Sequence, residues 1–324
     1  MMDTLNLFLA FDFVRYKEKF QHIIRLFNQE PTISVNKINK EEYYRGNIKN
    51  LLILINHNSL TVIGSICKFY YGTNQKTLTY TDLLDAILKL EELLDVELDN
   101  ATVTRIDLAE NLLMENKPES YYSLLIKGGF LKRREDDNGL YYRSGNRAIC
   151  IYDKLVQEKQ SKNTIEVELE GENVLRYEFR MKNNREISKR LGVTNARLID
   201  VINNYGLLVW YWCKSFDLIP KDIEIEMPSK TTFSTVTEFK NYLAGHGLKY
   251  LGGYGRVINM IHEAKSRGVF NYPAQSSNLK TMVKELVSKL SGNNAPEMLV
   301  ELENRLKESM AGAIMDYWQI SGEV

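Results

Sequence analysis

The sequence contains little cysteine and histidine, and the few residues of these types are scattered. Its 324 residues include three cysteines (Cys67, Cys150 and Cys213) and four histidines. An odd number of widely spaced cysteines argues against a disulfide framework and a zinc knuckle. No pair of histidines or cysteines has the spacing of a zinc motif, and no Walker glycine loop occurs. These absences argue against a histidine-rich metal site and a P-loop nucleotide site.

Long apolar runs and an excess of charge of one sign are also missing. Apolar runs such as Leu51 to Ile55 are far shorter than the ~20 residues of a membrane span. The first residues carry an acid and no basic segment, unlike a signal peptide. Basic and acidic residues both number 42, which is weak evidence against a promiscuous nucleic-acid binder. We therefore expect a cytoplasmic protein without membrane contact.

The apolar pattern predicts an α+β fold in two parts. Strand-like runs occupy the first half, and a helix is expected over residues 80–100. The expected strands cover residues 4–13, 50–56, 60–72, 102–110 and 174–182, with a hairpin over 141–154. After about residue 185 the pattern is mostly helical. We expect an antiparallel-rich sheet with helices on one face, followed by a helical C-terminal region.

Three of the expected strands combine an apolar face with a polar one, because successive side chains of a strand point to opposite sides. The polar faces hold Arg105 and Asp107 in the first strand, Cys150, Tyr152 and Lys154 in the second, and Arg176, Glu178 and Arg180 in the third. If the strands lie in one sheet, these faces combine into one surface.

Such a surface suits metal-assisted phosphoryl transfer. Asp107 and Glu178 could bind Mg²⁺ or Mn²⁺ through oxygen, and a metal on a phosphate oxygen orients the attacking group. A tyrosine with a pKa of about 10 is a poor nucleophile until a metal or a cation such as Lys154 favours the phenolate. Arginines suit phosphate oxygens. The wet face of an ordinary antiparallel sheet also carries alternating charges, so the pattern alone leaves both interpretations open.

The segments VTRIDLAEN, RAICIYDKLVQEK and VLRYEFRMK occur in this order between residues 103 and 182. They resemble the replication initiators of filamentous phages, of the gene II and gene X type, and the related plasmid rolling-circle initiators. The likeness extends over about residues 1–200. It implies a metal-dependent enzyme that nicks and rejoins DNA, with Asp107 and Glu178 as metal ligands and Tyr152 as the nucleophile beside Lys154. Glu158 is a further implied ligand if the chain after Lys154 brings it within reach.

The implied reaction is a sequence-specific transesterification at a replication origin. The phenolate of Tyr152 attacks one strand, forms a 5′-phosphotyrosine and frees a 3′-OH for a host polymerase, which acts with a host helicase. The covalent link keeps the phosphodiester energy, so the strand can be rejoined after a round of rolling-circle replication. Tyr141, in the segment LYYRSGN, is the second candidate nucleophile, because some plasmid initiators carry a Y-x-G-S motif on that strand.

Basic side chains in both parts are candidate contacts to origin DNA. They are Arg105, Arg176 and Arg180 on the sheet, and Arg185, Lys189, Arg190 and Arg197 in a helix–glycine–helix segment. Many helical hairpins that only pack within a protein have the same helix–glycine–helix pattern. We expect residues 1–185 to form the nicking domain and residues 186–324 a DNA-binding or oligomerisation region, in which the terminal amphipathic helix forms a homodimer or packs on its own domain.

Two other functions stay open from the sequence. The charged face could be the platform of a non-catalytic protein that binds an origin or RNA. Alternatively, the protein could be a metal-dependent nuclease that hydrolyses DNA without a covalent intermediate.

Overall fold

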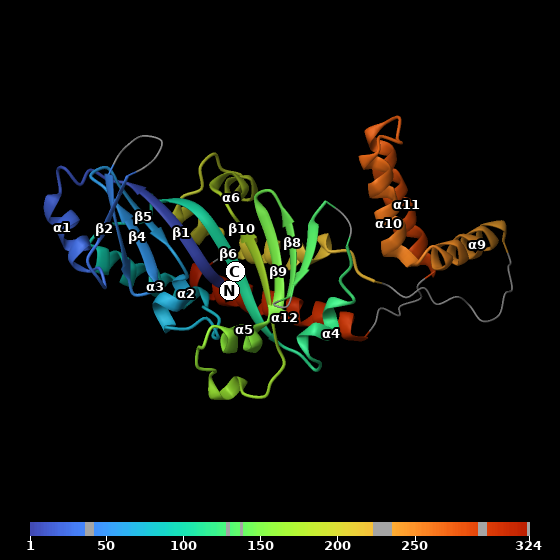
Figure 1. The fold of residues 1–324 in the computed structure, drawn as a ribbon, viewed down its shortest axis with the longest axis horizontal. Helices are drawn as coiled ribbons and strands as arrows, with labels where there is room; N and C mark the ends of the chain where they lie inside the picture. The colour runs from blue at the N-terminus through green and yellow to red at the C-terminus, as the bar shows by residue number, and fades with distance from the viewer. Residues whose placement is uncertain (36–41, 128–129, 137–138, 223–234, 291–296, 323–324) are drawn as a thin grey trace.

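The computed structural model describes residues 1–35, 42–127, 130–136, 139–222, 235–290 and 297–322. Ten strands are found in these ranges: β1 (Met2–Ala10), β2 (Thr32–Val35), β3 (Glu42–Ile48), β4 (Leu51–Ile55), β5 (Ser59–Ile63), β6 (Thr102–Leu113), β7 (Lys132–Asp136), β8 (Gly139–Ser144), β9 (Arg147–Asp153) and β10 (Val174–Met181). They form one antiparallel sheet in the order β2-β3-β4-β5-β1-β6-β10-β9-β8-β7 (Figure 1). The predicted α+β class is confirmed.

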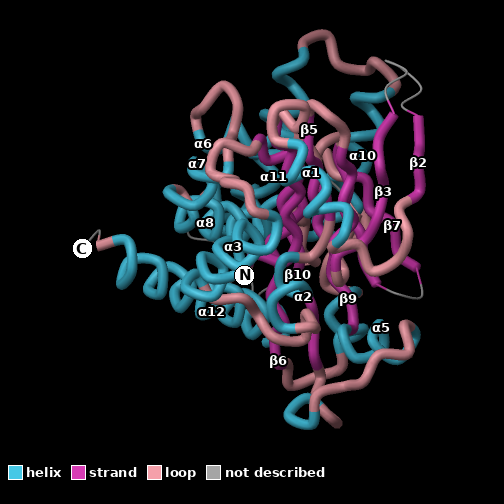
Figure 2. The backbone as a smooth tube through the Cα atoms, turned by 90° about the vertical axis from the view of Figure 1, so that its left-hand side faces the viewer, coloured by secondary structure: helices cyan, strands magenta, loops and turns pink. Residues whose placement is uncertain are grey.

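Twelve α-helices are found in the described ranges, and several of them cover one face of this sheet (Figure 2). The first eight are α1 (Lys17–Arg25), α2 (Ile66–Tyr71), α3 (Tyr80–Leu94), α4 (Pro118–Tyr122), α5 (Lys154–Gln160), α6 (Asn184–Leu191), α7 (Leu198–Asn203) and α8 (Tyr205–Ser215). The others are α9 (Val236–Tyr250), α10 (Gly253–Ser266), α11 (Pro273–Leu290) and α12 (Glu297–Ser321). Figure 2 shows α3, α8 and α12 gathered on one side of the strands. The apolar faces of the central strands are fully buried there, in one hydrophobic core.

The predicted strand over residues 60–72 is wrong in its second half. After β5 the chain turns into the short helix α2, because Ser65 caps its first turn by accepting a hydrogen bond from the Lys68 amide. Gly72 ends the helix at φ 80°, a left-handed conformation that glycine adopts without strain. These two capping residues outweigh the β-branched residues of the segment. The helix predicted over residues 80–100 is confirmed as α3, but it ends at Leu94.

The hydrophobic core continues past residue 185. Ile187 of α6, Trp212 of α8 and Leu306 of α12 belong to the same core as the sheet. Helices α9, α10 and α11 form a second, smaller cluster around Leu248 and Ile258, at one end of the molecule in Figure 1. The division of the chain near residue 185 stays a prediction. Within the described ranges, no helix is long and apolar enough to cross a membrane.

Candidate functional site

The register of the central strands brings the three predicted polar faces together. Across β10, Glu178 lies opposite Cys150 of β9 and Ala109 of β6, and Arg180 lies opposite Asp107. Residues directly opposite each other in an antiparallel pair share a face of the sheet. Tyr141 of β8 joins the same face, because it lies opposite Cys150. We call this group the polar face; it comprises Arg105, Asp107, Tyr141, Tyr152, Arg176, Glu178 and Arg180.

Glu178 lies at the centre of the polar face. Its Oε1 accepts hydrogen bonds from the Tyr152 hydroxyl at 2.7 Å and from Arg176 Nε at 2.7 Å, and its Oε2 accepts one from Arg180 Nε at 2.8 Å. The side chain is 4% exposed. Burial raises the pKa of Glu178, but the two arginines outweigh it and lower the pKa to about 2. Glu178 is therefore an anion whose hydrogen-bonding capacity is already used.

Asp107 is the second buried carboxylate of the polar face. Arg105 binds it in a bidentate manner, with Nε to Oδ1 at 2.9 Å and Nη2 to Oδ2 at 2.6 Å. Arg180 also approaches it, at 3.6 Å, and so bridges Asp107 and Glu178. Burial raises the pKa of Asp107, while Arg105 acts in the opposite direction. Each predicted metal ligand on the sheet is thus paired with arginine.

Arg176 connects the polar face to residues that the sequence analysis missed. Its guanidinium contacts Asp3 at 3.2 Å, the Asn111 amide oxygen at 2.9 Å and the Asn74 carbonyl at 3.1 Å, besides Glu178. The strand alternation does not reveal Asp3, because β1 has a register shift between Met2 and Thr4. Asn74 lies in the connection between α2 and α3, where no periodicity applies. For Asp3 and Asn74 the sequence offers one signal, a polar side chain close to an expected strand.

Lys154 and Glu158 form a separate buried pair beside this network. Asp153 caps α5 by accepting a hydrogen bond from the Val156 amide, so Lys154 begins a helix and Glu158 lies one turn later. Lys154 Nζ donates to Glu158 and, at 2.9 Å, to the Asn74 side chain. Burial lowers the pKa of Lys154. Burial alone would raise the pKa of Glu158, but the hydrogen bond from Lys154 has the stronger effect, and the pKa of Glu158 is lowered. Among the described residues, no hydrogen bond joins Lys154 to Tyr152, and Glu158 is paired with Lys154.

The two candidate tyrosines have different surroundings. Tyr152 is 8% exposed, and burial holds the pKa of its hydroxyl well above the usual value. Tyr141 is half-buried, and the guanidinium of Arg143 lies 5.4 Å from its ring centre. Burial raises the pKa of Tyr141 as well, whereas Arg180 acts to lower it. Of the two, Tyr141 is the more accessible to a large substrate.

Gly139 sets the spacing between the strands that carry these tyrosines. A Cβ atom at this position would lie 2.4 Å from the Ile151 carbonyl oxygen and 2.6 Å from the Tyr152 Cβ. Its φ of 136° also disfavours other residues. The predicted turn at Asn138 and Gly139 lies partly outside the described residues, because Asn138 is not among them.

The predicted divalent cation fits the polar face in ligand type but not in this arrangement. Carboxylate oxygens are suitable donors for Mg²⁺ or Mn²⁺, yet those of Asp107 and Glu178 are paired with guanidinium groups. In the part of the chain that the structure describes, no three acidic, histidine or cysteine side chains form a cluster that could hold a metal. We therefore derive no step of the chemistry through a metal.

The predicted helix–glycine–helix segment is present as α6 and α7, with Gly192 ending α6 in a left-handed conformation. Arg185 and Lys189 are exposed on α6. Arg190 instead binds Glu186 at 3.0 Å and stacks on Phe179 and Tyr211. Arg197 binds the Asp200 carboxylate at 3.4 Å. Two of the four DNA contacts predicted in this segment thus have partners within the protein.

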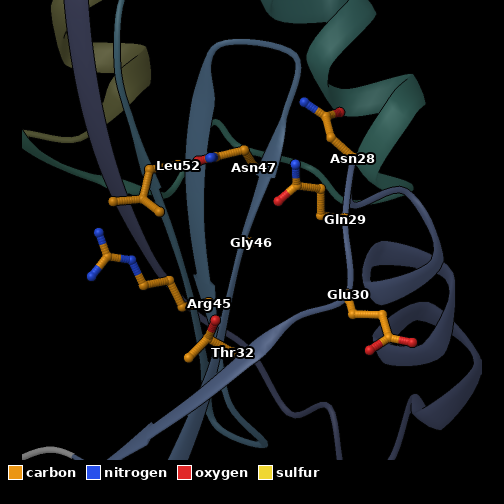
Figure 3. A pocket seen from close by; sticks show the side chains of 8 residues that line it. All are labelled: Asn28, Gln29, Glu30, Thr32, Arg45, Gly46, Asn47 and Leu52. Atoms are coloured by element: carbon orange, nitrogen blue, oxygen red, sulfur yellow. The ribbon is translucent and has the colours of Figure 1, made fainter.

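Two cavities lie around the sheet, one near α5 and one on β3 and β4. One, of about 670 Å³, adjoins the Lys154 pair and is lined by Lys68, Gly72, Thr73, Gln75, Glu158 and Lys162 to Val167. The other, of about 290 Å³, lies on β3 and β4 beside the chain after α1 (Figure 3). Its lining residues are Asn28, Gln29, Glu30, Thr32, Arg45, Gly46, Asn47 and Leu52. Neither of these two cavities has a tyrosine in its lining.

The fold and the polar face define an α+β protein whose sheet carries tyrosines, carboxylates and arginines on one surface. The family model of the N-terminal part of the phage replication-associated gene II protein matches residues 44–199, from β3 to α7. This match supports a replication initiator of the filamentous-phage gene II type and a role in the initiation of replication. The matched range contains every residue of the polar face, whereas Asp3 precedes it. A comparison with curated proteins found no match.

Proposed function

We propose that the polar face binds a phosphodiester of the replication origin and that a tyrosine of this face attacks it. One observation supports this most strongly: four adjacent strands, β6, β10, β9 and β8, place two tyrosines, two carboxylates and three arginines on one surface. Perturbed carboxylates next to a nucleophile-type side chain are typical of functional sites. The arginines suit phosphate oxygens, and the tyrosines supply the attacking group.

The proposed reaction exchanges one phosphate ester for another. The phenolic oxygen forms a bond to phosphorus as the bond from phosphorus to the 3′-oxygen breaks. The phenol loses its proton to solvent, and the 3′-oxygen takes up a proton and leaves as a hydroxyl group. The product is a 5′-phosphotyrosine, and the reverse attack by a 3′-hydroxyl rejoins the strand. Arg105 and Arg180 would stabilise the charge that develops on the phosphoryl oxygens.

The geometry favours Tyr141 over Tyr152 as the attacking residue, which reverses the order that the sequence suggests. The Tyr152 hydroxyl donates a hydrogen bond to Glu178 and is almost inaccessible, so an incoming phosphate would have to displace Glu178 from it. Tyr141 lies on the next strand, half-buried, at the border of the same face. We assign Tyr152 the role of holding Glu178 in place, and Lys154 that of fixing Asn74 beside Arg176.

DNA outside the nick would contact the exposed basic residues Arg185 and Lys189 of α6. The freed 3′-hydroxyl would serve as a primer for a host polymerase, with a host helicase separating the strands. The requirement for Mg²⁺ or Mn²⁺ and the formation of a homodimer stay predictions.

The proposal is tested with end-labelled single-stranded DNA that carries the origin of the element encoding this chain, incubated with the protein and Mn²⁺. We expect a protein–DNA adduct that survives detergent, is lost in Tyr141→Phe and is retained in Tyr250→Phe, a change at a tyrosine that is 91% exposed. An adduct that persists in Tyr141→Phe and disappears in Tyr152→Phe would restore the order from the sequence. Nicking without an adduct would favour the hydrolytic nuclease, and binding without nicking the non-catalytic protein.

A further inference from the structure

The helices α9, α10 and α11, which we call the helical module, carry an excess of positive charge that the rest of the chain lacks. Residues 235–290 contain eight lysines and arginines, three glutamates and no aspartate. Since the chain has 42 basic and 42 acidic residues, 34 basic and 39 acidic residues lie outside this range. The module has its own hydrophobic cluster and follows the residues that the family model matches. The net charge of zero thus combines a basic helical module with an acidic remainder.

Two lysines and a histidine meet where α10 and α11 pack together. His262 and Lys265 are three residues apart on α10 and therefore lie on one face of that helix. Burial lowers the pKa of His262, and the charges of Lys280 on α11 and of Lys265 lower it further. Burial lowers the pKa of Lys280 as well, with a contribution of the same sign from Lys265. We call these three residues the basic seam.

The groups of the basic seam have no partners within the described part of the chain. Nε2 of His262 is buried there without a hydrogen-bond partner, a property that it shares with the Tyr205 hydroxyl alone. The ammonium groups of Lys265 and Lys280 form no hydrogen bond or ion pair among the described residues. Like charges that lie close together repel each other, and an unpartnered buried polar atom is costly. An anion with several oxygen atoms would remove both costs.

A phosphate of the DNA backbone is such an anion. Lysine binds phosphate as a point charge, and an imidazole N–H donates a hydrogen bond to a phosphate oxygen. Contacts of this kind supply most of the sequence-independent affinity of proteins for DNA. Single strands are usually held by aromatic rings that stack on bases. The basic seam instead offers charge and a hydrogen-bond donor, which favours the backbone of a duplex.

We propose that the basic seam binds backbone phosphates of duplex DNA next to the replication origin. Phosphate contacts position a protein without reading sequence, so the helical module holds the chain on DNA while the polar face carries out the attack. The seam is a second DNA contact, far along the chain from Arg185 and Lys189 of α6. This inference rests on the proposed function for the identity of its ligand as DNA.

The first test titrates the full chain against a short fluorescent duplex, unrelated in sequence to the origin, at several salt concentrations. We expect the double variant Lys265→Gln/Lys280→Gln to bind at least about tenfold more weakly near 0.1 M salt. The slope of log affinity against log salt should fall by about 2, because each phosphate contact releases about 0.9 counterion. Circular dichroism verifies that the variant is folded.

The matched control for this titration is Lys240→Gln/Lys249→Gln. It removes the same charge from two exposed positions of α9, in the same helical module. We expect it to lower the slope by less than about 0.5. Equal losses in the two double variants would mean that only the total charge of the module matters, and they would overturn the inference. Absence of duplex binding by the unmodified chain would overturn it as well.

The second test follows the imidazole signals of the four histidines by nuclear magnetic resonance, with His262 assigned from the variant His262→Gln. We expect the His262 signal to shift when the duplex is added. The signal of His22 should stay in place, because its Nε2 lies 2.9 Å from the Leu93 carbonyl oxygen on another part of the chain. Inorganic phosphate at the same ionic strength should shift His262 far less than the duplex does.

A His262 signal that does not move in the presence of saturating duplex would contradict the inference. So would a signal that moves with inorganic phosphate but not with the duplex, because the seam would then bind free phosphate. The duplex contains no origin, so a missing protein–DNA adduct contradicts only the proposed function, and both tests of the seam still decide the inference.

Discussion

The face of the sheet opposite α3, α8 and α12 has two halves with different chemistry. On β6, β10, β9 and β8 it carries the polar face, in which charged groups of the same strand and of neighbouring strands are paired. On β1, β5, β4 and β3 the same face carries Phe8, Thr61, Leu54 and Arg45, which follow one another across the strands. Arg45 is the only charged residue of that row. One sheet thus has a buried ionic network on one half and an ordinary exposed surface on the other.

The contrast shows what distinguishes a functional face from a merely wet one. Alternation places polar side chains on one side of a strand in both halves. Among the described residues of the two halves, only the polar face has carboxylates that are buried and each held by more than one cation. Taking charges out of water is costly, and uncharged residues of similar shape would be at least as stable. A network of this kind therefore points to a role in binding or chemistry.

The largest expected effect is the loss of the Glu178 charge. Glu178→Gln leaves Arg176 and Arg180 without their main counter-ion, and we expect the free energy of unfolding to fall by about 3 kcal/mol or more. Urea unfolding followed by circular dichroism measures the change. A loss below about 1 kcal/mol would show that the network contributes as little as an exposed ion pair.

The acid dependence of stability should also report on Glu178. Because the pKa of this side chain falls from 4.5 to about 2 on folding, its stabilising contribution is complete above pH 4.5 and is lost as the pH falls toward 2. The contribution amounts to about 3 kcal/mol. We expect Glu178→Gln to reduce the slope of unfolding free energy against pH in this window. An unchanged slope would assign the acid sensitivity to other carboxylates.

A smaller effect should follow from widening the gap between β8 and β9. Gly139→Ala places a Cβ against the Ile151 carbonyl and the Tyr152 side chain, so we expect a loss of about 2 kcal/mol and weaker adduct formation. Gly145→Ala is the matched control, because Gly145 also has a positive φ but no atom within 4 Å of the added Cβ. It should cost about 1 kcal/mol and leave the adduct intact. Equal effects of the two changes would mean that the close approach at Gly139 is unimportant.

The smallest effect is expected on the other half of the sheet. Arg45 is exposed on β3 and lines the smaller cavity. Arg45→Gln should change the free energy of unfolding by no more than about 0.5 kcal/mol and leave DNA affinity and adduct formation unchanged. A strong loss of DNA binding in this variant would extend the functional surface beyond the polar face.

Much of the polar face could be predicted from the sequence, because β6, β9 and β10 are regular strands. Alternation alone placed Asp107, Tyr152 and Glu178 on one surface, and the register confirms it. Prediction from strand alternation fails where the backbone departs from a regular strand. Asp3 lies at a register shift, and Lys154 was expected to extend a strand but begins α5 because Asp153 caps that helix.

The pairing of the charges could not be predicted either. The sequence shows which residues can bind a metal or a phosphate, but not that Arg180 bridges Asp107 and Glu178. The partners of Arg176 and Lys154 include Asn74, which lies in the connection between α2 and α3 and is distant from both residues in the sequence.

The central claim is that a tyrosine of the polar face attacks origin DNA. Its most direct test is to locate the covalent link between protein and DNA. The adduct formed with origin DNA and Mn²⁺ is digested with protease and nuclease, and the peptide bearing a nucleotide is sequenced by mass spectrometry. We predict a nucleotide on Tyr141 of β8. A nucleotide on a tyrosine outside the polar face, or nicked DNA without any modified peptide, would contradict the claim.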